Sequence, residues 1–268
     1  MSESIRVVVH GALGRMGKEV VNALCHDPET DPVGAVDLRA TEEQLALPDG
    51  SGSIPFSSDL ESMVEESRPN VLVDFTLAQA TMPAVQMAVR HKVNLVIGTT
   101  GLSVSDLDEI DKMTRDNGLG AVVASNFALG AVMMMHLSEV AAKFFDWAEI
   151  IELHHEQKAD APSGTALSTA KALVRSKGGP FSYASAEKEP LPGTRGGQVD
   201  GVGIHSVRLP GLSAHQEVVF GAPGQTLTIR HDTIDRRCYM PGVLLAVKKV
   251  SELKGLTNGL DVLLGLKS

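Results

Sequence analysis

Residues 5–17 read IRVVVHGALGRMG, an apolar run that leads directly into three glycines with the spacing Gly-x-x-Gly-x-x-Gly. The run of β-branched residues favours a buried strand, and the amphipathic stretch at 14–26 favours a helix. Glycine tolerates positive φ and lets the backbone approach a ligand closely, and the free N–H groups of a helix N-terminus attract phosphate. The stretch therefore predicts a strand, a phosphate-binding turn and a helix.

A carboxylate follows this turn at the distance expected for ribose binding. Asp37 lies about 20 residues beyond the glycines, at the end of the second apolar run. The glycines alone could form a tight strand–helix connection and nothing more, but Asp37 favours a dinucleotide. It favours NADH, because a 2′-phosphate would meet a carboxylate, whereas Arg15 and Arg39 could supply cations for NADPH. NADH and NADPH are therefore both retained as cofactors.

The first half of the chain alternates short apolar runs with amphipathic stretches. The runs predict strands at residues 5–9, 33–36, 71–75, 95–97 and 121–124, and the stretches predict helices at 14–26, 60–66, 81–91 and 105–117. Such alternation is typical of a parallel sheet covered by helices on both faces. We expect a Rossmann-type, doubly wound parallel sheet that forms a dinucleotide-binding domain over residues 1–127.

The pattern changes after residue 128. It predicts helices at 130–145 and 165–176, a strand at 148–155, a long Gly/Pro-rich loop at 178–203, and strands typical of a meander at 203–208, 216–220 and 226–231. Residues 240–264 return to helical spacing. We expect a second α+β domain with an open mixed sheet over residues 128–236, for substrate binding and oligomerisation, and a C-terminal segment, 237–268, that returns to the first domain.

Composition restricts the class of partner. The 268 residues carry a formal net charge of −9, which argues against nucleic acid because duplex binding needs a basic face. No apolar segment approaches the roughly 20 residues that span a bilayer. The two cysteines, Cys25 and Cys238, lie far apart, match no metal spacing and indicate a reducing compartment. We expect a cytoplasmic protein with a small-molecule ligand and no nucleic-acid or membrane partner.

The stretch ELHHEQKADAPSGTA at residues 152–166 carries the second group of chemical side chains. A metal site at His154 and His155 is disfavoured, because neighbouring strand residues point to opposite faces and zinc-type spacing is missing. Solvated or core histidines are the plain alternative. Two histidines, Lys158 and a helix-opening Ser-Gly-Thr within about a dozen residues instead favour an anionic-substrate site, because helix amides, a hydroxyl and an ammonium group hold carboxylates well.

This stretch resembles the signature of the 4-hydroxy-tetrahydrodipicolinate reductase (dihydrodipicolinate reductase) family, approximately E-x-H-H-x-x-K-x-D-A-P-S-G-T-A. The glycine-rich turn, which ends in Gly-Arg-Met-Gly, is similar to the cofactor turn of that family. Further similar stretches occur at 74–76, 98–101, 125–127, 195–197 and 203–206. The resemblance extends from residue 5 to the C-terminus.

The resemblance implies an enzyme of lysine and diaminopimelate biosynthesis. Such an enzyme reduces 4-hydroxy-tetrahydrodipicolinate, or its dehydrated form dihydrodipicolinate, to tetrahydrodipicolinate by hydride transfer from NADH or NADPH. The substrate is a small dicarboxylate heterocycle, and the expected assembly is a homotetramer formed through the second domain's sheet. Many members have an arginine directly after the acidic residue, whereas this chain has Leu38 there and Arg39 next, so the cofactor preference stays open.

The expected site residues fall into three groups. His154 and Lys158 are the catalytic residues, with His154 as general acid because an imidazole pKa near 6.5 suits proton transfer at neutral pH. The residues expected to bind the substrate carboxylates are His155, Ser163, Gly164 and Thr165. The residues expected at the cofactor are Gly11, Ala12, Gly14, Arg15, Met16, Gly17, Asp37, Arg39, Phe75, Thr76, Gly98, Thr99, Thr100, Ser125, Asn126, Phe127 and Arg236.

Alternatives accompany these assignments. Arg236 could equally form a structural ion pair. A related amino-acid dehydrogenase, acting for example on aspartate, would share the first domain, but the cluster from Lys158 to Thr165 speaks against it. A nicotinamide-sensing regulatory module would not need that cluster and would carry a partner-binding or basic segment.

Overall fold

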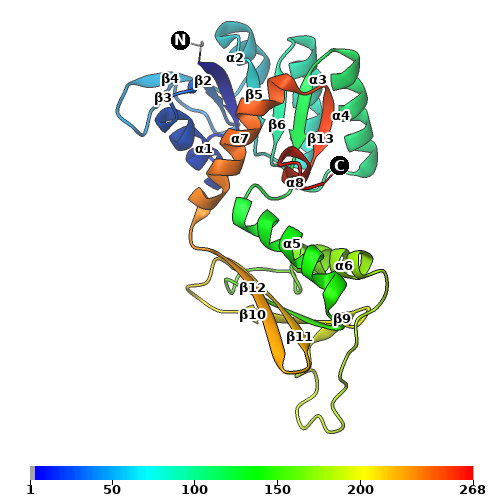
Figure 1. Cartoon of the computed structure of the whole chain (residues 1–268). Helices are drawn as coiled ribbons and strands as arrows, with labels where there is room; N and C mark the ends of the chain where they lie inside the picture. Colours follow the sequence, from blue (N-terminus) through cyan, green and yellow to red (C-terminus); the bar gives the residue numbers. More distant parts are fainter. Residues whose placement is uncertain (1–3, 268) are drawn as a thin grey trace. The chain divides into compact units, whose positions relative to one another are not determined.

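The computed structural model describes residues 4–267 and divides the chain into two compact units, both shown in Figure 1. The first unit contains the residues up to Leu129 and those from Arg236 onward, and the second contains Gly130–Asp235. The chain therefore leaves the first unit once and returns to it through helix α7 (Met240–Lys249).

The first unit is built on an eight-stranded sheet with the order β13-β7-β6-β5-β1-β2-β4-β3. Its strands are β1 (Ile5–His10), β2 (Thr30–Val36), β3 (Gln44–Ala46), β4 (Ser53–Ser57), β5 (Val71–Asp74), β6 (Asn94–Ile97), β7 (Gly120–Val123) and β13 (Gly255–Asn258). All neighbouring pairs are parallel except β3 with β4. The doubly wound parallel sheet expected from the sequence is confirmed.

Helices α1 (Arg15–His26), α2 (Leu60–Ser67), α3 (Ala78–Arg90) and α4 (Val104–Asp116) connect these strands. Strands β5 and β7 are buried along their whole length, which explains their continuous apolar sequences. Strand order changes direction on either side of β1, since β2 and β4 lie on one side of it and β5, β6 and β7 on the other. In such sheets, ligands bind at the carboxyl ends of the strands beside this point.

The C-terminal segment differs from the expected continuous helix over 240–264. Helix α7 ends at Lys249, a 3-10 turn follows at Val250–Glu252, and β13 then pairs with β7 before the short helix α8 (Leu260–Leu263). Gly255, the first residue of β13, has φ +84°, which is not a helical conformation, and the Leu256 amide donates to Asp111 of α4. The prediction was wrong here because apolar spacing over so few residues fits a strand as well as a helix.

The second unit contains a five-stranded sheet with the order β12-β11-β8-β10-β9. Its strands are β8 (Trp147–His154), β9 (Gly197–Val199), β10 (Val202–Arg208), β11 (Ala214–Ala222) and β12 (Gln225–Thr233). Strands β8 and β10 are parallel and the other neighbours are antiparallel, so the expected open mixed sheet is confirmed. The predicted meander is wrong for β10 and β11, because β8 lies between them in the sheet. The predicted loop at 178–203 is interrupted by strand β9.

Helix α5 (Leu129–Ala141), a 3-10 turn at Ala142–Phe144 and helix α6 (Gly164–Lys177) belong to the same part of the chain. The expected helix at 130–145 therefore ends earlier than its apolar sequence indicates. Alternate residues of β8, such as Ala148 and Ile150, are buried in a core that includes Leu173 of α6 and Phe220 of β11. This alternation assigns the even-numbered residues of β8 to the helix-covered face and the odd-numbered ones to the other face.

Candidate functional site

The glycine-rich turn of the first unit has the geometry that phosphate binding requires. Gly11 has φ +86°, and a Cβ atom there would lie 2.7 Å from the carbonyl oxygen of Phe75. A Cβ on Gly17 would collide with the carbonyl of Gly11. Gly14 caps helix α1 without a side-chain hydrogen bond from any described residue, so the first helix amides face outward for an anion.

Asp37 lies next to this turn and is almost fully buried. Its carboxylate accepts from the Leu13 amide at 3.0 Å and from the Arg39 guanidinium at 2.9 and 3.1 Å. The hydrogen bond from Arg39 lowers the pKa of Asp37 and outweighs the effect of burial. The ionised Asp37 carboxylate and the exposed Arg39 guanidinium therefore lie side by side. The carboxylate suits ribose hydroxyls, and the guanidinium suits a 2′-phosphate.

The remaining residues predicted to contact the cofactor follow consecutive strands of the same sheet. The Phe75 amide donates to His10 O, and the Gly98 amide donates to Asp74 O, so the ends of β1, β5 and β6 lie side by side. A Cβ on Gly98 would collide with the Phe75 ring, which also packs against Phe127 at 5.9 Å between ring centroids. Thr100, Ser125 and Arg236 are exposed, whereas Thr99 is buried, and Ala12, Arg15, Met16, Thr76 and Asn126 complete the predicted set in this unit.

Asp74 organises these strand ends and was missed in the assignment of site residues. It is 1% exposed and accepts hydrogen bonds from the hydroxyls of Thr76 at 2.7 Å, Thr81 at 2.7 Å and Thr99 at 3.2 Å. His10 Nδ1 also lies 3.0 Å from its carboxylate, without the alignment of a hydrogen bond. The available signal was an acidic residue at the end of an otherwise apolar strand, since buried carboxylates occur with dedicated partners.

The second unit places its chemical groups at the end of β8. Register pairs Glu152 with Ser206 and Gln216, and pairs His154 with Arg208 and Ala214, so these residues form two rows on the helix-covered face. His154 Nδ1 lies 2.5 Å from Glu152 Oε2, and Arg208 binds the same carboxylate with both terminal nitrogens, at 2.8 and 2.9 Å. Glu152 and Arg208 contact one another beside His154, and neither was predicted from the sequence as a site residue.

The charges in this cluster influence one another. Burial alone would raise the pKa of Glu152, but hydrogen bonds from Arg208, Ser206 and His154 lower it, so the carboxylate is ionised. Burial lowers the pKa of His154 below 6.5, and Lys158 and Arg208 add to this against the opposing effect of Glu152. At neutral pH, His154 is therefore mainly a neutral imidazole with its Nδ1 beside a carboxylate.

Lys158 and His155 lie on the segment after β8. The Lys158 ammonium is partly buried and lies 2.6 Å from the exposed carboxylate of Asp160. The Lys158 amide donates to the carbonyl of His155, whose side chain is exposed. Lys158 thus forms an ion pair, and His155 lies at the surface of the unit.

Ser163 begins helix α6 and is occupied by structural hydrogen bonds. Its hydroxyl accepts from the Ala166 amide at 3.1 Å, and its own amide donates to Glu152 at 3.2 Å. Gly164 and Thr165 supply the first amides of the helix, which have no partners within it. Gly164 is exposed, and a Cβ there would meet no atom within 4 Å, so a carboxylate can approach these amides.

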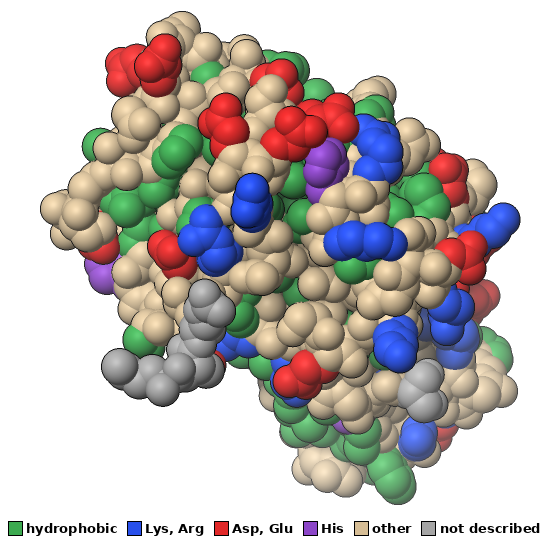
Figure 2. Space-filling model, turned by 90° about the horizontal axis from the view of Figure 1, so that it is seen from above, with side chains coloured by type: hydrophobic (Ala, Val, Ile, Leu, Met, Phe, Trp, Pro, Cys, Tyr) green, Lys and Arg blue, Asp and Glu red, His purple; other side chains and the backbone are tan. Residues whose placement is uncertain are grey.

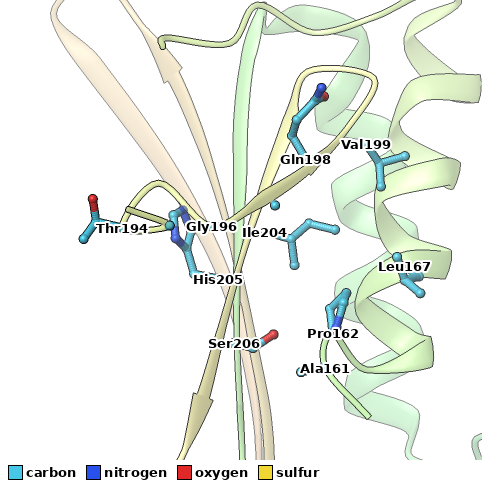
Figure 3. Close-up of a pocket in the computed structure, with 12 residues that line it drawn as sticks. Ala161, Pro162, Leu167, Thr194, Gly196, Gln198, Val199, Ile204, His205 and Ser206 are labelled. Atoms are coloured by element: carbon cyan, nitrogen blue, oxygen red, sulfur yellow. The ribbon is translucent and has the colours of Figure 1, made fainter. Parts of the chain in front are cut away.

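A cavity of about 550 Å³ in the second unit lies beside this cluster. Figure 3 shows Pro162 and Leu167 on its α6 side and His205 and Ser206 on β10. Its lining contains none of the six residues expected to act on the substrate. The cavity and the cluster at the end of β8 are therefore distinct features, although Ser206 of the lining hydrogen-bonds to Glu152.

Surface charge, the character of the helices and the grouping of metal-ligand side chains all concern the partners expected from the sequence. On the face seen in Figure 2, acidic and basic side chains are interspersed. Within residues 4–267, no helix has the length and apolar character needed to cross a membrane. The same residues include no group of three or more His, Cys, Asp or Glu side chains placed to hold a metal ion.

Comparison with known proteins identifies the family. The family model of the dihydrodipicolinate reductase N-terminus matches residues 5–127, and that of its C-terminus matches residues 130–263. A 4-hydroxy-tetrahydrodipicolinate reductase of Dehalococcoides mccartyi is 56% identical over 262 residues, which are 98% of this chain and 99% of that protein. The enzyme of the same name from Moorella thermoacetica is 48% identical over 266 residues, with 98% and 99% covered.

A solved structure agrees with these sequences. Dipicolinate-bound dihydrodipicolinate reductase from Paenisporosarcina sp. TG-14 is 38% identical and superposes with a TM-score of 0.87, covering 97% of this chain and 99% of that one. Both halves of the chain and its fold thus match one family of reductases. The chain therefore belongs to the dihydrodipicolinate reductase family and is an oxidoreductase.

Proposed function

We propose that this chain reduces 4-hydroxy-tetrahydrodipicolinate, or its dehydrated form dihydrodipicolinate, to tetrahydrodipicolinate with NADH or NADPH, in lysine and diaminopimelate biosynthesis. The observation that carries the proposal is the grouping, at the end of β8, of a carboxylate-bound histidine, a lysine and a helix N-terminus with an open approach. A relative with 38% identity has been solved with dipicolinate, a planar dicarboxylate, bound to it.

The first unit is the proposed dinucleotide-binding domain. When bound, the nicotinamide supplies the hydride, which is chemistry that no protein side chain provides. The outward amides after Gly14 suit a pyrophosphate, and Asp37 with Arg39 suits the adenosine ribose. The Phe75 ring, set against Gly98, gives the strand ends an apolar surface for the flat nicotinamide ring.

The second unit is the proposed substrate-binding domain. The amides of Gly164 and Thr165, together with the Thr165 hydroxyl, bind one substrate carboxylate at the start of α6. Lys158 exchanges its partner Asp160 for a substrate carboxylate, because the ion pair is accessible to solvent and a surface pair of this kind is weak. His155 binds from the surface, and Ser163 keeps the helix start in place through its cap.

Reduction adds one hydride and one proton to the substrate, and His154 is the proposed proton donor. Its Nδ1 faces Glu152, so its Nε2 is the nitrogen that carries the exchangeable proton. Because the pKa of His154 is lowered, little of it is protonated at neutral pH, and the proton must be replenished during each turnover. Lys158, which is cationic and close in sequence, stabilises developing negative charge or shares the proton transfer.

We also propose a homotetramer in the cytoplasm, assembled through the second unit's sheet. The face of β8 opposite the helices begins with Trp147, which is 45% exposed, and continues with the partly exposed Ile151 and Leu153. Apolar side chains on an uncovered sheet face are well suited to burial between subunits. Sedimentation of the purified protein should give the tetramer mass, and a monomer would contradict this assembly.

The activity is tested by following oxidation of NADH and NADPH in parallel assays. The substrate is generated in place from pyruvate and aspartate semialdehyde by the preceding synthase, and omission of that synthase is the control. We expect oxidation that depends on the synthase and is lost in His154→Gln with little change in cofactor affinity. A protein that binds a nicotinamide cofactor but oxidises neither with this substrate would refute the proposed function.

A further inference from the structure

Glu152 has an unusual environment for an acidic residue. It is 0% exposed and lies in the middle of the sheet, on the helix-covered face of the central strand. Its carboxylate accepts from two nitrogens of Arg208, from the Ser163 amide and from Ser206, and faces His154 Nδ1. Nearly every lone pair of the carboxylate therefore has a fixed partner, and its orientation is determined from three sides.

These partners come from three different elements of the second unit. His154 ends β8, Ser163 begins α6, and Arg208 ends β10. Arg208 also donates to the carbonyl of Asp160 at 2.7 Å, which attaches the segment that carries Lys158. One buried ion pair thus connects the general acid, the carboxylate-binding helix start and the lysine segment.

Glu149 provides an internal comparison on the same strand. It also lies against a histidine and an arginine, His205 and Arg195, each at 2.5 Å. It is three residues from Glu152 and therefore on the opposite face of β8, where it is 37% exposed. Its histidine is not one of the residues assigned to the substrate.

We propose that Glu152, held by Arg208, is a positioning residue that fixes His154 as the Nδ1–H tautomer and aims its Nε2 at the substrate. The inference rests on the proposed role of His154 as proton donor. A carboxylate can only accept, so the nitrogen facing it must carry hydrogen in the neutral ring, and the opposite nitrogen is then the one that gains and loses the catalytic proton. Arg208 and the Ser163 amide keep the carboxylate from rotating away.

The direct test is the tautomer of His154 in the unaltered protein. Long-range ¹H–¹⁵N correlation spectra of protein labelled at histidine distinguish the two neutral tautomers, and the His154 signals are identified by their absence in His154→Gln. We expect the Nδ1–H form above the pKa of the ring. A neutral His154 with hydrogen on Nε2 would overturn the proposal, whatever any variant does.

The kinetic test compares Glu152→Gln with Glu149→Gln as the matched control. An amide at 152 can donate as well as accept, so it no longer enforces one tautomer. We expect Glu152→Gln to lower kcat at least about tenfold, as loss of an orienting partner commonly does, with the KM for the nicotinamide unchanged. Glu149→Gln should keep kcat within a factor of about two, and Glu152→Asp should lie between them, with the Nδ1–H tautomer kept.

The outcomes separate this inference from the proposed function. If Glu152→Gln is folded and keeps both wild-type kcat and the Nδ1–H tautomer while His154→Gln is inactive, Glu152 is not a positioning residue, although the proposed function stands. If Glu149→Gln loses as much kcat as Glu152→Gln, the effect is structural and the inference fails. If His154→Gln retains full turnover, the role of His154 is wrong and the inference fails with it.

Discussion

Replacing Thr81 by valine should destabilise the first unit by removing one hydrogen bond to a buried charge. Thr81 is fully buried, and its hydroxyl donates to Asp74 Oδ2 at 2.7 Å, while Thr99 donates to the same oxygen at the longer distance of 3.2 Å. Valine has nearly the same shape as threonine, so the packing is kept. The Asp74 carboxylate loses the shorter of these two hydrogen bonds to its Oδ2. A hydrogen bond to a charged group contributes about 1.5–3 kcal/mol, and we expect a loss of about 2 kcal/mol.

Thr114→Val is the matched control. Thr114 is also fully buried and also lies on a helix of the first unit, but its hydroxyl donates to the carbonyl of Ile110 at 2.7 Å, which is a neutral acceptor within the same helix. Removing such a bond leaves a carbonyl that the helix already uses, so the loss should stay below about 1 kcal/mol.

Urea denaturation at fixed protein concentration, followed by circular dichroism, measures both free energies of unfolding. For Thr81→Val, a loss of about 2 kcal/mol corresponds to a fall in the thermal midpoint of about 4–8 °C for a domain of this size. If Thr81→Val is no more destabilising than Thr114→Val, Asp74 does not depend on these hydroxyls, and its place as the organiser of the strand ends is refuted.

Three further predictions concern the two proposed ligand sites. Gly17→Ala should weaken NADH binding at least about tenfold, because the added Cβ would displace the Gly11 carbonyl from the phosphate turn; fluorescence titration measures it. Arg39→Ala should reduce kcat/KM for NADPH more than for NADH, and raise the pKa of Asp37 toward its ordinary value, which steady-state kinetics with both cofactors will test. Turnover should fall as pH rises through the lowered pKa of His154, since only the protonated ring donates, and a pH profile in which His154→Gln keeps this step would contradict the assignment.

Some features of the site follow from residues that are close in sequence. The strand–turn–helix around Gly11 depends on local preferences, namely β-branched residues, glycine at positive φ and a helix start, and the structure contains it. The run from His154 to Thr165 similarly contains a strand end, a turn and a capped helix within a dozen positions. The parallel sheet was predictable for the same reason, because continuous apolar strands alternate with helices.

Other features depend on tertiary structure. The predicted helix at 240–264 ends at Lys249, and residues 255–258 form the edge strand β13 by pairing with β7. Strand β8 lies between β10 and β11, although neither is adjacent to it in sequence, and pairing with both satisfies the backbone groups along its two edges. Strand order depends on which surfaces can be buried together, which local periodicity does not encode.

The sequence by itself determined the doubly wound sheet, the phosphate turn and the histidine–lysine stretch, because each can be predicted from patterns among residues that are close in sequence. Only the tertiary structure decided which residues hold these groups in place. Arg208 is 56 residues from Glu152, and Thr99 is 25 residues from Asp74. A buried carboxylate requires hydrogen-bond donors, but any donor that the fold brings within about 3 Å will serve. The identity of these donors therefore depends on the tertiary structure and cannot be predicted from neighbouring residues.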